Sequence, residues 1–312
     1  MRVVKWLLLS TALLAVAPVA SAAALRERPV AGPLSAIGIA GTDIGYADEY
    51  RRGCHEVRRW DVATRGDVRV ASHCFVSTST GSGVAGVAVT EGRTLWLTYA
   101  GGNIRDWSLW TKRGRAPARR IAFKSADVDG AAPIVLGRAW EESLPYAVGR
   151  TIVVLSPNGS RRFSVDAPAE VGALSAHSRG YAAVLADGSV LRLSLTGRVL
   201  GQTPYAPGFV QFAVLAAPGL VVKTGAGLEI HRDGAIRRIP LPAGSRFLGL
   251  SAGIVAYGTG RQLRLRRLAN GHDVLFRTLT SRFEAQLGRR GIAYASGRTL
   301  GFTVAAFVSS SV

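Results

Sequence analysis

Short apolar segments and segments of alternating polarity, separated by glycine-containing turns, repeat along most of the chain. Residues 179–202 show the pattern: the apolar run Tyr181–Ala186 is followed by Asp187-Gly188 and then by the alternating run Val190–Leu195. An Asp-Gly pair between apolar runs favours a tight hairpin, because both residues can adopt a positive φ. We therefore predict antiparallel hairpins, and the same order of strand, turn and strand recurs at 253–277 and 291–304.

Seven copies of one unit account for nearly the whole chain. The first strand of a unit is continuously apolar, as in residues 84–89, whereas a third strand alternates, with Leu263 and Leu265 expected to face inward. The pattern predicts an all-β fold: a β-propeller of seven blades, each of four antiparallel strands, with six blades as the alternative. The units start roughly 40 to 50 residues apart, near Ser35, Ser82, Ala132, Ala169, Gly208, Ser245 and Arg282.

The last unit shows only three strands, at 283–287, 291–295 and 298–304. A ring of blades must cover its open edge, because an unpaired strand edge invites aggregation. The segment Arg26–Gly32 precedes the first full unit and contains no other element. We therefore expect it to supply the missing outer strand and so to close the ring.

The first 22 residues resemble a secretory signal peptide. Arg2 and Lys5 form a basic start, an apolar core follows, and Ala20-Ser21-Ala22 is a site of small residues suited to cleavage. We expect cleavage after Ala22 and a single propeller domain over 23–312. The remaining chain shows no segment apolar enough for a membrane helix. An exported monomer without a transmembrane segment is the expectation.

Cys54 and Cys74 are the two cysteines of the chain, and they flank the outer hairpin of the first unit. Pairing Val62 with Asp67 places Cys54 opposite Phe75, within one residue of Cys74. An exported protein with cysteines so placed is expected to form a disulfide. The adjacent His55 and His73 suggest a zinc site as an alternative, but strand alternation turns the histidines away from the cysteines. We expect no metal.

Arginine dominates the charge of this basic chain, whose formal net charge is +19. Arginine presents a planar set of donors that suits carboxylates and phosphates. Because an exported protein rarely meets nucleic acid, we expect an anionic polymer or an acidic protein as partner. In five units the turn between the second and third strands carries candidate ligand-binding residues, namely Arg51, Arg52, Asn103, Arg105, Arg150, Arg261 and Arg298.

The strand–Asp-Gly–strand–Thr-Gly–strand repeats resemble those of bacterial secreted β-propellers, of which quinoprotein-like and YVTN-type proteins are examples. Trp-Asp, the pair that ends the third strand of WD40 blades, occurs once, at Trp60-Asp61, and we expect no third strand to end in that manner. The resemblance implies a binding or interaction module for an anionic glycan, a cell-wall polymer or an acidic protein. A lyase or quinoprotein-like oxidoreductase and a ligand-free scaffold are the alternatives. Residues 81–86 match the dinucleotide-binding pattern GxGxxG, but a predicted strand rather than a helix follows, so we expect no cofactor. No catalytic set is found.

Overall fold

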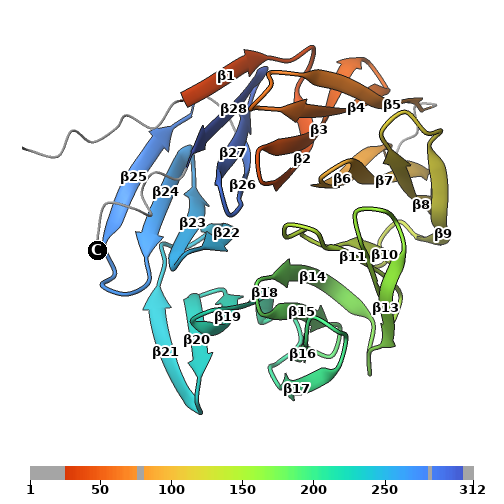
Figure 1. The fold of residues 1–312 in the computed structure, drawn as a ribbon. Helices are drawn as coiled ribbons and strands as arrows, with labels where there is room; N and C mark the ends of the chain where they lie inside the picture. The colour runs from red at the N-terminus through yellow and green to blue at the C-terminus, as the bar shows by residue number, and fades with distance from the viewer. Residues whose placement is uncertain (1–24, 76–80, 280–282, 305–312) are drawn as a thin grey trace, which may run out of the picture.

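The computed structural model describes residues 25–75, 81–279 and 283–304. These residues form seven four-stranded antiparallel sheets arranged as blades in a ring (Figure 1). The first strands of the blades surround the central channel that is general in β-propellers. Seven blades, rather than six, are therefore present. The expected signal segment, residues 1–22, lies outside the described residues. Within them, no helix is long and apolar enough to cross a membrane.

Each blade runs from an inner first strand to an outer fourth strand. Blade 1 contains β2 (Leu34–Ala40), β3 (Asp43–Arg51), β4 (Cys54–Asp61) and β5 (Asp67–Cys74). Blade 2 contains β6 (Gly83–Thr90), β7 (Arg93–Gly101), β8 (Ile104–Arg113) and β9 (Arg119–Asp127). Blade 3 contains β10 (Ile134–Leu136), β11 (Leu144–Val148), β12 (Thr151–Leu155) and β13 (Arg161–Asp166).

The remaining blades repeat this order. Blade 4 contains β14 (Val171–His177), β15 (Gly180–Leu185), β16 (Val190–Leu193) and β17 (Val199–Thr203). Blade 5 contains β18 (Val210–Ala216), β19 (Gly219–Thr224), β20 (Gly227–Arg232) and β21 (Ala235–Pro240). Blade 6 contains β22 (Arg246–Ser251), β23 (Ile254–Thr259), β24 (Gln262–Arg267) and β25 (Asp273–Thr278). Blade 7 contains β26 (Phe283–Leu287), β27 (Gly291–Ser296), β28 (Thr299–Val304) and β1 (Leu25–Pro29).

The strand from the N-terminal end completes blade 7, as predicted from the sequence. β1 pairs antiparallel with β28, from Leu25 opposite Thr303 to Pro29 opposite Thr299. Figure 1 shows β1 as the outermost strand of the last blade. The ring is thus closed by hydrogen bonds between the two ends of the described chain.

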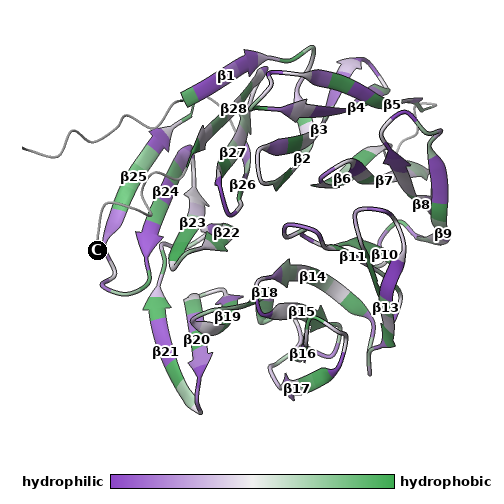
Figure 2. Cartoon of the chain, in the orientation of Figure 1, coloured by the Kyte–Doolittle hydropathy of each residue, from purple (hydrophilic) through white to green (hydrophobic). Residues whose placement is uncertain are grey.

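The hydrophobic core lies between the blades. Among the described residues there are seven buried apolar clusters, and each contains side chains from two adjacent blades. This explains why the inner strands are apolar throughout, since both of their faces are covered. The outermost strands face water on one side, and Figure 2 shows hydrophilic segments on β1, β9 and β13. Leu263 and Leu265 are buried in β24, as the alternating pattern predicted.

Glycine allows neighbouring inner strands to approach one another closely. Gly38 in β2 faces the backbone of β6, and a Cβ atom there would lie 2.2 Å from the carbonyl oxygen of Val87. The small residues of the first strands are therefore required by the packing around the channel.

Two local expectations were wrong. At the blade 4 hairpin only Gly188 has a positive φ (89°), and the Asp187 carboxylate accepts a hydrogen bond from the Ser189 N–H instead. The loop is longer than two residues, with Val184 paired to Val190, so Asp187 is not forced into the left-handed region. Trp60-Asp61 also ends a third strand, β4, contrary to expectation.

Candidate functional site

The turns between second and third strands all lie on one face of the ring, because antiparallel strands reverse at each turn and the blades are equivalent. The five turns that carry the predicted binding residues belong to blades 6, 7, 1, 2 and 3, which follow one another around the ring. The structure brings all the predicted binding residues to these turns or to the adjoining strand ends. We name this set the arginine arc: Arg51, Arg52, Asn103, Arg105, Arg150, Arg261 and Arg298.

The backbone of the arc is anchored while most of its side chains reach solvent. The carbonyl oxygens of Arg150, Arg261 and Arg298 accept hydrogen bonds from residues 167, 279 and 30. Arg52 and these three arginines are exposed. Among the described ion pairs, none includes Arg51, Arg52 or the three arginines Arg150, Arg261 and Arg298. On the same face, the Glu49 carboxylate accepts a hydrogen bond from the Gly53 N–H rather than pairing with an arginine of the arc.

Arginines within the blades are used differently. Arg58 and Arg264 contact Asp67 and Asp273 at 2.8 and 2.9 Å, and both carboxylates also accept a tyrosine hydroxyl. These arginines neutralise carboxylates on the outer strands of the same blade. The distinction separates these structural arginines from the exposed arginines of the arc, Arg52, Arg150, Arg261 and Arg298, whose charge can reach an external anion.

The opposite face is mixed in charge. It carries basic turns at Arg65, Lys112, Arg113 and Arg232, but it also contains a pocket of about 420 Å³. The two faces therefore differ in more than the number of arginines, because carboxylates outnumber arginines in the lining of this pocket. The charged lining residues are Asp43, Asp61, Glu91, Glu141 and Glu142, with Arg59 and Arg290.

Aromatic side chains flank the arc at blade 2. The Arg105 guanidinium lies over the Tyr99 ring, 4.9 Å from its centroid, and Tyr99 packs against Trp107 at 5.4 Å. Trp107 is partly exposed, whereas Trp96 is fully buried between the blades and stacks on Trp110. Trp107 and Tyr99 can therefore contact a ligand at the arc, and Trp96 cannot.

Cys54 and Cys74 form a disulfide and lie directly opposite each other in β4 and β5. The predicted register, with Cys54 opposite Phe75, was wrong by one residue. The assumed starting pair was wrong, because Asp67 lies opposite Trp60 rather than Val62, a difference of two residues. A bulge between Val57 and Arg58 then shifts the pairing back by one residue. The bulge leaves the two sulfur atoms well placed to bond.

His55 and His73 form the next pair of the ladder, so their side chains point away from the disulfide. His73 Nε2 accepts a hydrogen bond of 2.8 Å from Trp96 Nε1. Burial lowers the pKa of both histidines. In the described part of the chain, no group of three or more His, Cys, Asp or Glu side chains could hold a metal ion.

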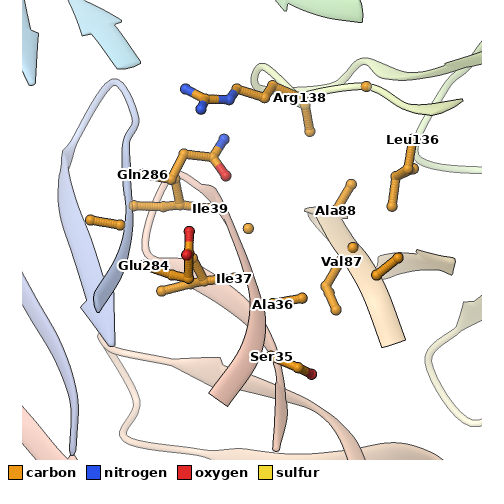
Figure 3. Close-up of a pocket in the computed structure, with 16 residues that line it drawn as sticks. Ser35, Ala36, Ile37, Ile39, Val87, Ala88, Leu136, Arg138, Glu284 and Gln286 are labelled. Atoms are coloured by element: carbon orange, nitrogen blue, oxygen red, sulfur yellow. The ribbon is translucent and has the colours of Figure 1, made fainter. Parts of the chain in front are cut away.

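Two charged residues that the sequence did not single out, Arg138 and Glu284, line the central channel. Arg138 follows the short strand β10, and its side chain extends across the channel toward Gln286 (Figure 3). It lines a cavity of about 180 Å³ together with residues of β2, β6 and β26. Its sequence context, Gly-Arg-Ala, gives no signal of this location, because the position depends on how the chain leaves β10.

No protein-family model matches the chain, and no curated protein matches its sequence. Solved structures match its fold. A chain in the crystal structure of a mitotic checkpoint complex is 13 % identical, with a TM-score of 0.58, over 97 % of this chain and 98 % of that one. The WD40 domain of Neurospora crassa Pan2 is 14 % identical, with a TM-score of 0.54, over 88 % and 90 %.

A third match is Sqt1 of Saccharomyces cerevisiae, 10 % identical with a TM-score of 0.51 over 89 % of this chain and 98 % of that one. Identities this low establish the fold alone, which is a seven-bladed, WD40-like β-propeller. The comparisons support neither a quinoprotein-like nor a YVTN-type assignment, so that resemblance remains a prediction.

Proposed function

We propose that the protein is an exported β-propeller binding module that holds an anionic polymer across the arginine arc. The observation that carries the proposal is the distribution of charge. Five consecutive blades present arginine on one face. Five of these arginines make none of the described ion pairs with the protein's own carboxylates, namely Arg51, Arg52, Arg150, Arg261 and Arg298.

The shape of the arc favours an extended ligand. Arginines at five consecutive blades are separated by the width of a blade, so a single small anion contacts only one of them. A glycan or cell-wall polymer with repeated carboxylates or phosphates contacts several at once, and linked contacts raise the overall affinity. Trp107 and Tyr99 offer an aromatic surface for a sugar ring beside Arg105.

Export and an interaction role complete the proposal. The signal-like segment over residues 1–22 supports delivery to the cell envelope or beyond, where such polymers occur. The WD40-like fold supports a role in binding, because it presents many loops on a rigid ring. An acidic protein is the alternative partner for the same arc.

The test is binding of residues 23–312 to two purified polymers, a polyuronate and a poly(glycerol phosphate), over a series of salt concentrations. We expect saturable binding that weakens as salt screens the charges. The variant Arg52→Ala/Arg261→Ala/Arg298→Ala should bind at least about ten-fold more weakly, because its three contacts are each worth roughly 0.5–1 kcal/mol. These side chains make no described hydrogen bond, so the fold should be unaffected.

The matched control removes the same charge from the opposite face. Arg113, Arg115 and Arg198 are exposed in turns between third and fourth strands. The triple alanine variant at these positions should bind like the wild type. Equal weakening in both variants would show that net charge alone drives binding, and the arc would then have no specific role. Binding to acidic proteins but to neither polymer would favour the alternative partner.

A further inference from the structure

The segment between β10 and β11 lies beside the central channel and pairs with β14 of the neighbouring blade. After Leu136, the Arg138 N–H donates to the Leu174 carbonyl at 3.0 Å, and the Ala176 N–H donates to the Arg138 carbonyl at 2.9 Å. Arg138 thus forms an isolated parallel bridge with Ser175 of β14. These backbone bonds fix Arg138 against blade 4.

The Arg138 side chain reaches blades 5 and 6 from this anchor. Its guanidinium lies over the rings of Phe212 and Phe247, at 4.3 and 5.4 Å from their centroids. Nη2 donates to the Phe247 carbonyl at 2.8 Å. The aromatic rings hold the guanidinium plane in one orientation, and they recover part of the cost of removing it from water.

The charge of Arg138 is not neutralised by the protein. Its Nη1 atom is buried and has no hydrogen-bond partner among the described residues. Glu284 is the carboxylate whose charge acts on Arg138, but it is paired with Arg246 at 3.0 Å. Burial lowers the pKa of Arg138 to about 10. A buried charge without a partner is costly, so such groups are normally paired.

The cavity beside Arg138 is large enough for a small ligand. Its volume of about 180 Å³ corresponds to roughly six water molecules at about 30 Å³ each. The apolar side chains of Ile37, Ile39 and Leu136 line it, and the Gln286 amide lies on the side toward which Arg138 points (Figure 3). The cavity thus combines an apolar wall with donors from two side chains.

We propose that the central channel binds a small monocarboxylate, with Arg138 Nη1 and the Gln286 amide as its donors. A carboxylate supplies the acceptor that Nη1 lacks and neutralises the guanidinium. A single negative charge is favoured over a doubly charged phosphate, because Glu284 also lines the cavity and repels anions. This site is independent of the arginine arc, which lies on the turns of one face.

The experiment compares thermal unfolding and calorimetric titration in acetate, butyrate, phosphate and chloride at matched ionic strength. Wild-type protein should bind acetate or butyrate saturably and unfold at a higher temperature in their presence, because a ligand bound only to the folded state stabilises it. Arg138→Met should lose this shift. In chloride it should unfold at or above the wild-type temperature, because replacing a buried uncompensated charge by an apolar group is often stabilising.

Three further variants complete the design. Gln286→Leu should weaken carboxylate binding roughly three- to ten-fold, which corresponds to the loss of one hydrogen bond, and it tests the site even if Arg138→Met fails to fold. Arg150→Met makes the same chemical change at the arc and should retain the rise in unfolding temperature that carboxylates cause. The arc variant Arg52→Ala/Arg261→Ala/Arg298→Ala should also retain it, so failure of the polymer proposal is distinguishable.

Two sets of results would overturn the proposal. Either carboxylates shift wild type and Arg138→Met equally, or they shift and bind neither protein; in the second case a loss of stability of Arg138→Met in chloride shows what Arg138 does instead. That loss would make Arg138 purely structural. Equal, Arg138-dependent binding of phosphate would overturn the preference for a monocarboxylate.

Discussion

Glu27 links the closing strand to the interior of blade 7. The Tyr294 side chain begins on β27, passes over Gly301 of β28 and donates its hydroxyl to the Glu27 carboxylate on β1. A Cβ atom on Gly301 would lie 2.2 Å from the tyrosine ring, so glycine is required there. Arg277 of β25 pairs with the same carboxylate at 2.7 Å. Replacing Glu27 therefore tests how much side chains contribute to ring closure.

We expect Glu27→Ala to lower the free energy of unfolding by about 2 kcal/mol. The loss of a hydrogen bond to a charged acceptor costs about 1.5–3 kcal/mol, and Tyr294, only 1 % exposed, is left without its partner. The ion pair with Arg277 adds at most about 1 kcal/mol, because roughly a third of each side chain is exposed. Solvent access to Glu27 places the sum near the lower end of the range.

The assay is urea denaturation followed by circular dichroism and fluorescence, whose transitions should coincide. Tyr294→Phe should cost about 1 kcal/mol, and the double variant should show a coupling energy of about 1 kcal/mol between the two residues. Arg26→Ala, on the other face of β1, is the control and should cost under about 0.5 kcal/mol. A coupling energy of zero would show that backbone pairing alone closes the ring.

Two further predictions concern packing and pH. Gly38→Ala should lower the free energy of unfolding by about 2–3 kcal/mol in the same assay, because β2 and β6 must separate. The control is Gly172→Ala, whose Cβ would lie 3.7 Å from its neighbour and which should cost under about 1 kcal/mol. Equal losses would contradict the close approach of β2 and β6. Burial raises the pKa of Tyr46, Tyr257 and Tyr294 above the usual value of about 10. The neutral tyrosines therefore stabilise the fold fully below pH about 10, and this contribution is lost as the pH rises further. A scan of melting temperature against pH measures the loss. A melting temperature that stays constant above pH about 10 would refute this prediction.

The blade pattern was predictable from the sequence because it depends on local and repeated signals. Each inner strand is buried on both faces, so its apolar run stands out, and each turn requires glycine or a short polar residue. The closing strand was predictable by counting, since 283–304 supplied three strands to a blade that needs four.

The register at Cys54 was not predictable from the hairpin, because Asp67 lies opposite Trp60 rather than Val62, and the bulge near Val57 then shifts the pairing back by one residue. Neither feature is marked by a characteristic residue type. Arg138 was missed for a different reason. Its neighbours in space, Phe212 and Phe247, lie far along the chain in blades 5 and 6, and only the closed ring brings them together. Candidate residues in turns were placed correctly because topology assigns every such turn to the same face.

The pairing of β1 with β28 also has a consequence for how the chain matures. Of the described strands, β1 (Leu25–Pro29) is synthesised first and its partner β28 last, so β1 is unpaired while β2 to β27 are made. An unpaired strand edge promotes aggregation, and charged residues and proline are the usual protection against it. Four of its five residues, Arg26, Glu27, Arg28 and Pro29, are of these kinds. The charged residues and proline of the strand that closes the ring are thus also expected to protect it from pairing with another strand before β28 is made.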